Sequence, residues 1–243
     1  MQPRAVAITL GDVLSIRQLT KTYEGPRQRT VLAGVDLDLE PGEYVAVMGE
    51  SGVGKSTLLN LIAGLDRADS GSIKLDGVEL TTQDDDALTV LRRERMGFVF
   101  QAFHVLPYLT VAQNVALPLS LAGVPDAIAK TRVMTVLDAL RLGDRAGTMP
   151  RELSGGELQR VAIARAIVHK PTLVLADEPT GNLDSDTAVQ VLQLLRDQLT
   201  ARGASGILVT HSHVAAATAD RVLTLSRDGL RETPLAQPGR NAR

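Results

Sequence analysis

Short apolar segments alternate along the chain with amphipathic segments of helical spacing, and this alternation predicts strands joined by helices. Four segments have few polar interruptions, as in strands buried on both faces of a parallel sheet: residues 44–48, 97–101, 172–177 and 206–210. Helical spacing follows the first of them at residues 56–64 and the third from residue 184 onwards. We therefore predict an α/β domain with a parallel sheet at its centre.

A second group of segments predicts an antiparallel flap beside that sheet. Residues 35–39 alternate apolar and polar side chains with period two, which is typical of a half-exposed strand. Residues 72–75 and 78–80 flank Asp76 and Gly77, a strong signal for a hairpin turn. Because a hairpin joins antiparallel strands, we expect these segments to lie outside the parallel core.

Residues 103–151 interrupt the α/β pattern with helical spacing. We predict helices at residues 111–120 and 126–142, with breaks at Pro118 and at residues 123–125. This part of the chain is therefore expected to form a helical insert within the α/β domain.

The composition narrows the possible function classes. The 243 residues are 44% apolar, enough for a sizeable core, and a net charge of −2 gives no basic field for nucleic acid. The absence of cysteine excludes disulfides, cysteine nucleophiles and cysteine-bound zinc, and fits a reducing cytosol. No segment approaches the ~18–20 apolar residues of a membrane span, and residues 5–10 make a poor signal peptide. In a membrane process, another polypeptide would have to supply the membrane part.

A glycine-rich segment between a predicted strand and a predicted helix carries the strongest chemical signal. It matches the phosphate-binding pattern G-x-x-x-x-G-K-[ST] through Gly49, Glu50, Ser51, Gly52, Val53, Gly54, Lys55, Ser56 and Thr57. The backbone N–H groups of such a loop and the positive end of the following helix cradle phosphate groups. Lys55 would supply a charge for the outer phosphates, and Ser56 a hydroxyl for Mg²⁺.

Polar residues follow three other apolar segments at the points where they end. These residues are Gln101, the pair Asp177 and Glu178, and His211. Ligands of an open α/β sheet lie outside the carboxyl ends of its strands, so these side chains are candidates to face the phosphates. Asp177 suits Mg²⁺ through bound water, and Glu178 is the candidate to polarise an attacking water. Taken alone, Gln101 could equally be an ordinary polar residue at the start of a loop, and a histidine such as His211 is more often a hydrogen-bonded structural residue than a catalytic one.

A second anion site is predicted where Ser154, Gly155 and Gly156 open a helix that runs to about residue 168. The alternative is an ordinary glycine-rich N-cap ahead of Glu157. A simple GTPase or small kinase needs only one phosphate site. Two such sites in one chain therefore suggest a nucleotide held between two subunits.

In order and spacing, these motifs closely resemble those of the ATP-binding cassette (ABC) ATPases of ABC transporters. The resemblance identifies the Walker A loop (49–57), the Q-loop residue Gln101, the signature motif (153–157), the Walker B strand with its glutamate (173–178), the D-loop (181–184) and the switch histidine His211. It implies a P-loop NTPase fold with a RecA-like core, an antiparallel β flap and an inserted helical subdomain. Within the superfamily the chain is most similar to the LolD/MacB/FtsE group, on residues 99–115 and 176–184.

The resemblance also implies domain boundaries. A single ABC ATPase domain would span residues 13–229, with its α/β core and flap in 13–100 and 160–229. The helical subdomain with the signature motif would occupy residues 101–159, and a polar tail residues 230–243.

The family's motifs imply roles for individual residues. The expected catalytic residues are Glu178, His211, Gln101 and Lys55, and the expected Mg²⁺ ligands are Ser56, Gln101 and Asp177. Tyr23 stands where the family stacks an aromatic side chain on adenine. ATP would be bound by Tyr23, by residues 49–57 and by Ser154, Gly155, Gly156 and Glu157. After His211, Ser212 and His213 stand where Asp-Pro is commoner, so His213 is a rival for the switch role.

The implied function is ATP hydrolysis by a head-to-tail homodimer around two ATP molecules, coupled to an integral-membrane permease at the inner face of the cell membrane. The implied process is export, lipoprotein release or mechanotransmission. Phe103 and Tyr108 are hypothesised to help form the groove for a permease helix, although they could equally seal the helical insert onto the core. The alternative is a soluble ABC-type ATPase of DNA repair, chromosome handling or translation. The zinc modules, coiled coils or second cassette usual in those proteins are absent from this sequence.

Overall fold

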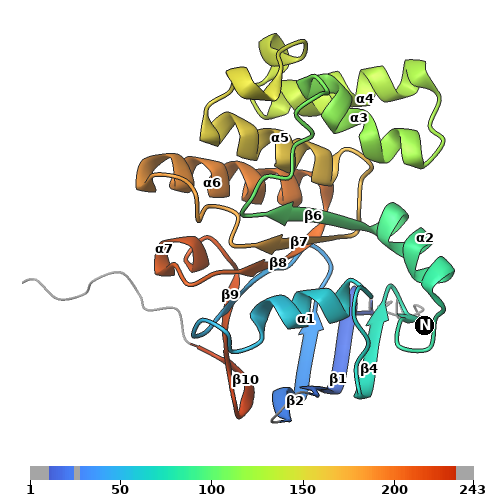
Figure 1. The fold of residues 1–243 in the computed structure, drawn as a ribbon, viewed down its shortest axis with the longest axis vertical. Helices are drawn as coiled ribbons and strands as arrows, with labels where there is room; N and C mark the ends of the chain where they lie inside the picture. The colour runs from blue at the N-terminus through green and yellow to red at the C-terminus, as the bar shows by residue number, and fades with distance from the viewer. Residues whose placement is uncertain (1–10, 25–27, 234–243) are drawn as a thin grey trace, which may run out of the picture.

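The computed structural model describes residues 11–24 and 28–233, which form two sheets with helices between and beside them (Figure 1). The larger sheet has six strands in the order β10-β9-β3-β8-β7-β6. Its strands are β3 (Tyr44–Met48), β6 (Met96–Phe100), β7 (Leu173–Asp177), β8 (Ser205–Val209), β9 (Arg221–Ser226) and β10 (Gly229–Glu232). Every pair in it is parallel except β9 with β10. The predicted α/β domain with a parallel centre is therefore confirmed.

The smaller sheet is the predicted antiparallel flap. Its four strands follow the order β2-β1-β4-β5, with β1 (Leu14–Tyr23), β2 (Arg29–Leu39), β4 (Ser70–Leu75) and β5 (Val78–Glu79). Leu75 pairs with Val78 across the predicted turn, where Asp76 and Gly77 both have positive φ, 48° and 78°. β1 and β2 are longer than the apolar pattern indicates, because their polar outer ends also pair, as far as Tyr23 with Arg29.

Helices cover both faces of the larger sheet. Helix α1 (Lys55–Ile62) lies between the two sheets, whereas the helices α3 (Val111–Leu121), α4 (Asp126–Ala139), α5 (Gly155–Ile167) and α6 (Ser185–Arg202) stack beyond its other face (Figure 1). Helix α2 (Asp85–Arg95) leads directly into β6, and the short α7 (His213–Ala216) follows β8. The short 3₁₀ helices η1 (Gly143–Arg145) and η2 (Pro150–Glu152) join α4 to α5.

Alternate residues of the central strands pack on opposite faces of the larger sheet. Val45 and Val47 of β3 pack in the core around α1 and the flap, whereas Ala46 faces the core built with α5 and α6. Glycine permits the closest approach between layers at β6, since a Cβ on Gly97 would lie 2.2 Å from the carbonyl oxygen of Ala166 in α5. The sheet is therefore packed on both of its faces by helices or by the flap.

The helical insert is confirmed, but Pro118 does not break it. Pro118 lies inside α3, where it removes one backbone donor, and the neighbouring Val115 and Leu119 remain fully buried. Packing of this apolar face outweighs the lost hydrogen bond. Buried Asn114 fixes the preceding loop by accepting from the Leu106 N–H at 2.8 Å and donating to the Leu109 carbonyl at 3.0 Å.

Two expected boundaries differ from the structure. Helix α5 runs through residue 160, so the expected junction between helical subdomain and core falls inside one helix. The first residues of the expected polar tail form β10, because Leu230 pairs with Leu225 of β9. Residues 234–243 of that tail lie outside the described residues. Within residues 11–24 and 28–233, no helix combines the length and apolar character that crossing a membrane requires.

Candidate functional site

The glycine loop joins β3 to α1 in a conformation that only glycine fits at two points. Gly49 has φ 152°, and a Cβ there would lie 2.5 Å from the Leu225 carbonyl oxygen. Gly54, with φ 119°, is the N-cap of α1, and no side chain caps that helix. The first backbone N–H groups of α1 therefore remain available to an anion, as the sequence pattern predicts.

Lys55 lies inside this loop. Its ammonium group donates to the carbonyl oxygens of Gly49 at 2.8 Å and Glu50 at 2.9 Å, and the residue is only 8% exposed. Both partners are neutral carbonyls, and they hold the ammonium group inside the loop, where phosphates would bind.

Asp177 and Glu178 extend from the carboxyl end of β7 toward the loop. Burial, reinforced by the charge of Glu178, raises the pKa of Asp177 above its ordinary value, while the Ser56 hydroxyl and Lys55 act in the opposite direction. Glu178 has φ 46°, a left-handed conformation that is uncommon for residues other than glycine. Its N–H donates to the Val209 carbonyl at 2.9 Å, so the neighbouring strand β8 holds the turn. The chain thereby stores local strain at a carboxylate beside the loop.

His211 contacts Glu178 directly. Its Nδ1 atom lies 2.9 Å from Glu178 Oε1, and the Thr210 hydroxyl donates to Oε2 at 3.3 Å. The structure thus brings together two of the predicted catalytic side chains. No contact of this kind joins His213 to Glu178 among the described residues.

One cavity of about 480 Å³ collects half of the predicted nucleotide-binding residues together with Asp177 and Glu178. Its lining includes Tyr23, Arg29, Val31, Ser51, Gly52, Gly54, Lys55, Ser56, Thr57, Asp177 and Glu178. The remaining loop residues, Gly49, Glu50 and Val53, line an adjoining hollow of about 890 Å³. A nucleotide in the first cavity would meet the loop, a carboxylate pair and an aromatic ring.

Gln101 is turned toward the segment after Glu178. Its Nε2 donates to Asn182 Oδ1 at 3.3 Å, and Asn182 Nδ2 donates to the Gln101 carbonyl at 2.9 Å. A Cβ on Gly181 would lie 2.7 Å from Gln101 Nε2, so the amide rests on this glycine. Gln101 does not line the nucleotide cavity in this arrangement, and its expected part in binding Mg²⁺ stays a prediction.

The predicted second anion site is the N-terminus of α5, away from the cavity in the same chain. Ser154 is the N-cap, and its hydroxyl accepts from the Glu157 N–H at 3.3 Å. Glu157 accepts in return from the Ser154 N–H at 2.8 Å, and this hydrogen bond lowers the pKa of its carboxyl group. Ser154 is thus an N-cap, as in the alternative interpretation of this segment, and Glu157 is used to hold the turn. The N–H groups of Gly155 and Gly156, in the first turn of α5, remain available to an anion.

The cavity also fits Mg²⁺. Ser56 and Asp177 both line this cavity, and their side chains are close enough to interact, so they offer neighbouring oxygen atoms of the kind that this ion prefers. In residues 11–24 and 28–233, no three His, Asp or Glu side chains gather into a protein-only metal site. That pattern suits an ion that keeps waters and takes its other ligands from phosphate groups.

Several contributors escaped the sequence patterns. Thr210 supports Glu178, Arg29 donates to the Gly52 carbonyl at 2.6 Å, and Arg165 of α5 donates to the carbonyls of Phe103 and His104 at 3.0 and 2.7 Å. Thr210 could have been found from the sequence, because it directly precedes His211. Neither arginine lies beside a motif residue in the sequence, so only the fold reveals their positions.

Comparisons with known proteins agree with this geometry. The family model described as ABC transporter matches residues 32–181. The chain is 48% identical over 219 residues to the lipoprotein-releasing system ATP-binding protein LolD of Pseudomonas fluorescens, covering 90% of this chain and 96% of LolD. It is 45% identical to the macrolide export ATP-binding/permease protein MacB of Rhodopseudomonas palustris, over 90% of this chain but only 34% of MacB.

A solved structure gives the same fold. The ATP-binding cassette MJ0796, solved as a dimer in a post-hydrolysis state bound to ADP and Pi, superposes with a TM-score of 0.82. The two sequences are 38% identical, and the match covers 92% of this chain and 99% of MJ0796.

Proposed function

The chain belongs to the ABC transporter family as an ATP-binding, ATP-hydrolysing subunit, and we propose that two copies of it sandwich two ATP molecules to drive a membrane permease. The observation that carries the proposal is the meeting of glycine loop, Asp177, Glu178 and His211 at one edge of the sheet. The close relation to LolD and MacB favours this function over a soluble ATPase of DNA repair or translation.

In the proposed mechanism, each residue of the cavity acts on a different part of ATP. Lys55 and the N–H groups of the loop bind the outer phosphates, and Tyr23 stacks on the base. Glu178 accepts a hydrogen bond from the attacking water and aligns it, while His211 holds the carboxylate in place. Bound by Ser56, Asp177 and phosphate oxygens, Mg²⁺ would neutralise charge that develops on the transferred group.

The N-terminus of α5 completes the site from a second copy. Within one chain Ser154, Gly155 and Gly156 do not line the ATP cavity, although the N–H groups at the start of α5 suit a phosphate. A head-to-tail dimer would bring them against the phosphates bound to the other copy. ATP would then join the two chains, and hydrolysis would release them. The dimeric state of MJ0796 supports such an assembly.

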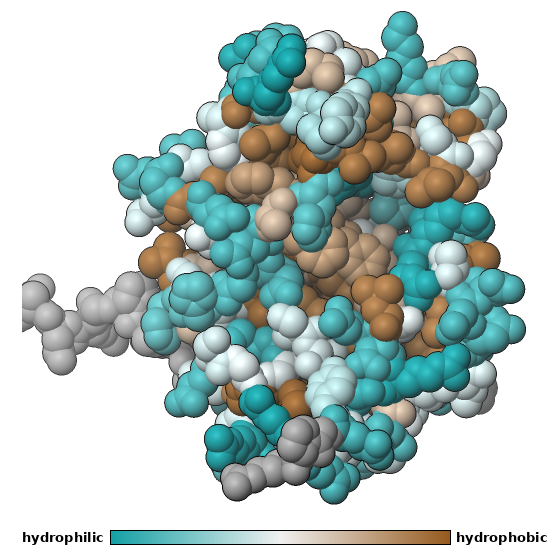
Figure 2. All heavy atoms as spheres, viewed as in Figure 1, coloured by the Kyte–Doolittle hydropathy of each residue, from teal (hydrophilic) through white to brown (hydrophobic). Residues whose placement is uncertain are grey.

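A permease helix would dock where the helical insert meets the core. Tyr108 is 89% exposed and Leu106 46% exposed, whereas Phe103 is half-buried, and its ring tip lies 3.9 Å from the position of a Cβ on Gly155. On the face viewed in Figure 2, apolar side chains gather over the helical half of the molecule. We assign contact with the partner to Tyr108, and to Phe103 a position between that contact and the α5 N-terminus.

The location and process follow from the relatives. A chain of this kind would lie at the cytoplasmic face of the cell membrane, held there by its permease. The names of LolD and MacB, lipoprotein-releasing and macrolide export, support outward movement or extraction of a substrate rather than uptake. The permease selects that substrate.

The test combines turnover with assembly. Glu178→Gln should retain ATP binding, lower the rate of phosphate release by at least about 100-fold and accumulate an ATP-bound dimer in size-exclusion chromatography. Lys55→Ala should instead weaken ATP binding itself, measured by nucleotide titration. Normal turnover by Glu178→Gln, or a monomer that binds ATP without ever dimerising, would overturn the proposal.

A further inference from the structure

Tyr23 is held by two residues outside the nucleotide motifs. Its hydroxyl donates a hydrogen bond to Asp66 Oδ2 at 2.7 Å. The ammonium group of Lys21 lies 4.9 Å from the centre of the Tyr23 ring and donates to Asp66 Oδ1 at 2.8 Å. Each of the three side chains therefore contacts the other two. Asp66 holds the hydroxyl edge of the Tyr23 ring, and Lys21 covers one face of that ring.

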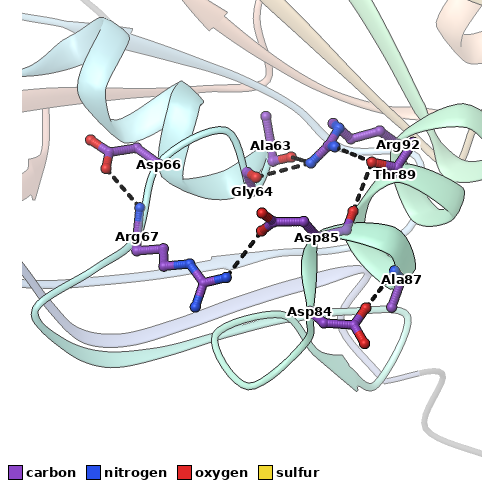
Figure 3. A network of polar contacts seen from close by, with 9 residues as sticks. All are labelled: Ala63, Gly64, Asp66, Arg67, Asp84, Asp85, Ala87, Thr89 and Arg92. Carbon is purple, nitrogen blue, oxygen red and sulfur yellow. Dashed lines mark hydrogen bonds and ion pairs between the residues drawn. The ribbon is translucent and has the colours of Figure 1, made fainter.

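Asp66 is itself firmly anchored (Figure 3). Its Oδ1 accepts from the Arg67 N–H at 2.7 Å, and the Arg67 side chain pairs with Asp85 of α2 at 3.0 Å. Arg92 of α2 donates to the Gly64 carbonyl at 2.9 Å, just before this loop. The carboxylate that binds Tyr23 therefore belongs to a loop tied to the neighbouring helix.

The charges of this cluster support one another. Burial acts to raise the pKa of Asp66, but hydrogen bonds from Lys21 and Tyr23 hold this pKa below its ordinary value. The hydrogen bond to Asp66 raises the pKa of Lys21 and of Tyr23, so the amine stays charged and the phenol stays protonated. The Lys21 side chain is 11% exposed and that of Asp66 28% exposed, which limits the motion of both.

The free face of the ring is therefore defined. Tyr23 is 41% exposed and lines the ATP cavity with Lys55 and Thr57. Because Lys21 occupies one face, a flat base can stack only on the other. We propose that Asp66 and Lys21 are positioning residues that hold the Tyr23 ring ready for the base of the nucleotide. This inference rests on the proposed ATP site and names what orients its base-binding part.

A ligand without a base separates this role from general support of the fold. Each variant is titrated with ATP and with inorganic tripolyphosphate, both in the presence of Mg²⁺. The ratio of the two affinities measures the contribution of the base to binding. Asp66→Ala should weaken ATP binding about fivefold, through the lost ordering of the ring, and leave tripolyphosphate binding unchanged. Tyr23→Phe, which removes only the hydroxyl, should have a similar effect, and the double variant should lose no more than either single one.

Two further variants sharpen the test. Asp66→Asn keeps an oxygen that accepts from the phenol and should restore most of the ATP affinity. Asp38→Ala removes another ion-paired carboxylate, which lies in β2 and pairs with Arg17 at 2.6 Å, and should leave both affinities unchanged. In turnover assays Asp66→Ala should raise KM for ATP with kcat preserved.

The outcomes distinguish this inference from the proposed function. Equal weakening of ATP and tripolyphosphate by Asp66→Ala, or unchanged ATP affinity in that variant, would overturn the positioning role. If Tyr23→Ala fails to change the ratio of the two affinities, Tyr23 does not bind the base, and this inference is lost while ATP hydrolysis stands. A wild-type protein that binds no ATP would overturn the proposed function itself.

Discussion

The Nδ1 atom of His211 lies 2.9 Å from Oε1 of Glu178, across the carboxyl ends of two neighbouring strands. The His211 side chain is 73% exposed, whereas that of Glu178 is 18% exposed, so the imidazole is the member of the pair with room to move. Thr210 restrains the other carboxylate oxygen. Glu178 is thus oriented before any nucleotide arrives.

This pair makes the two histidines distinguishable by substitution. We expect His211→Ala to lower kcat about 100-fold and to change the affinity for ATP by no more than about threefold, because Glu178 loses its orientation while the phosphate loop is unchanged. Phosphate release and nucleotide titration measure the two effects. His213→Ala is the matched control and should remain close to wild type; the reverse result would assign the switch role to His213.

The buried carboxyl of Asp177 predicts a gain of stability when its charge is removed. Its raised pKa means that the folded state binds this proton more tightly than the unfolded state. Stability is therefore lost as pH rises from about 3.9, the ordinary value, through the folded pKa. Nucleotide-free Asp177→Asn should melt a few degrees higher than wild type at pH 7, with the difference shrinking toward pH 4.

The melting temperature of the same variant should rise little when Mg²⁺ and ATP are added, because its asparagine lacks the carboxylate that the ion needs. Thermal scans across pH, with and without both ligands, measure the two effects together. A nucleotide-free Asp177→Asn that melts below wild type at pH 7 would show that this carboxylate stabilises the empty fold.

The contact of Gln101 with Gly181 predicts a sensitive position beyond the catalytic residues. A methyl group on Gly181 would lie within 2.7 Å of Gln101 Nε2 and must push the amide away. We expect Gly181→Ala to lower kcat about tenfold, with a smaller change in ATP affinity, because the loop that holds Gln101 shifts. Asp186→Asn, an exposed change nearby in α6, is the control. Unchanged turnover in Gly181→Ala would mean that this resting position of Gln101 has no part in catalysis.

The two roles of Ser154 can be separated because aspartate caps a helix as well as serine does. Ser154→Asp should preserve the melting temperature within about 1 °C, since α5 keeps its N-cap. Its negative charge would nevertheless repel the phosphates bound to the partner copy. In a Glu178→Gln background it should abolish the ATP-dependent dimer seen by size-exclusion chromatography. A dimer of unchanged stability would place the α5 N-terminus away from the nucleotide.

The sequence predicted best the features that depend on local pattern. Residues 44–48 and 172–177 are apolar runs that both end in chemistry-bearing residues, and the structure places them as β3 and β7 in one sheet with β8 between them. The glycine loop, the hairpin at Asp76 and the N-cap at Ser154 follow equally from neighbouring residues. The meeting of the glycine loop with Asp177 and Glu178 could be predicted because parallel strands end at one edge of the sheet.

Features that depend on distant segments were not predictable in this way. Pro118 normally ends a helix, and only the packing of Leu119 against other helices shows why α3 continues through it. Asp66 follows no motif, and its contact with Tyr23 depends on how the flap folds over α1. The pairing of Gln101 with Asn182 joins residues 81 positions apart. In each instance, tertiary contacts decide the outcome.

The hydrogen bonds from Arg165 to the carbonyls of Phe103 and His104 have a mechanical consequence. Both residues have left-handed backbones, with φ 53° and 51°, and the guanidinium group spans their two oxygens. Ser154 lies about 16 Å away at the other end of the same helix, from the rise per residue of an α-helix. Because the Phe103 ring also lies 3.9 Å from where a Cβ of Gly155 would stand, residues 103–104 contact α5 near both of its ends, and a displacement of this segment would move the whole helix as one body.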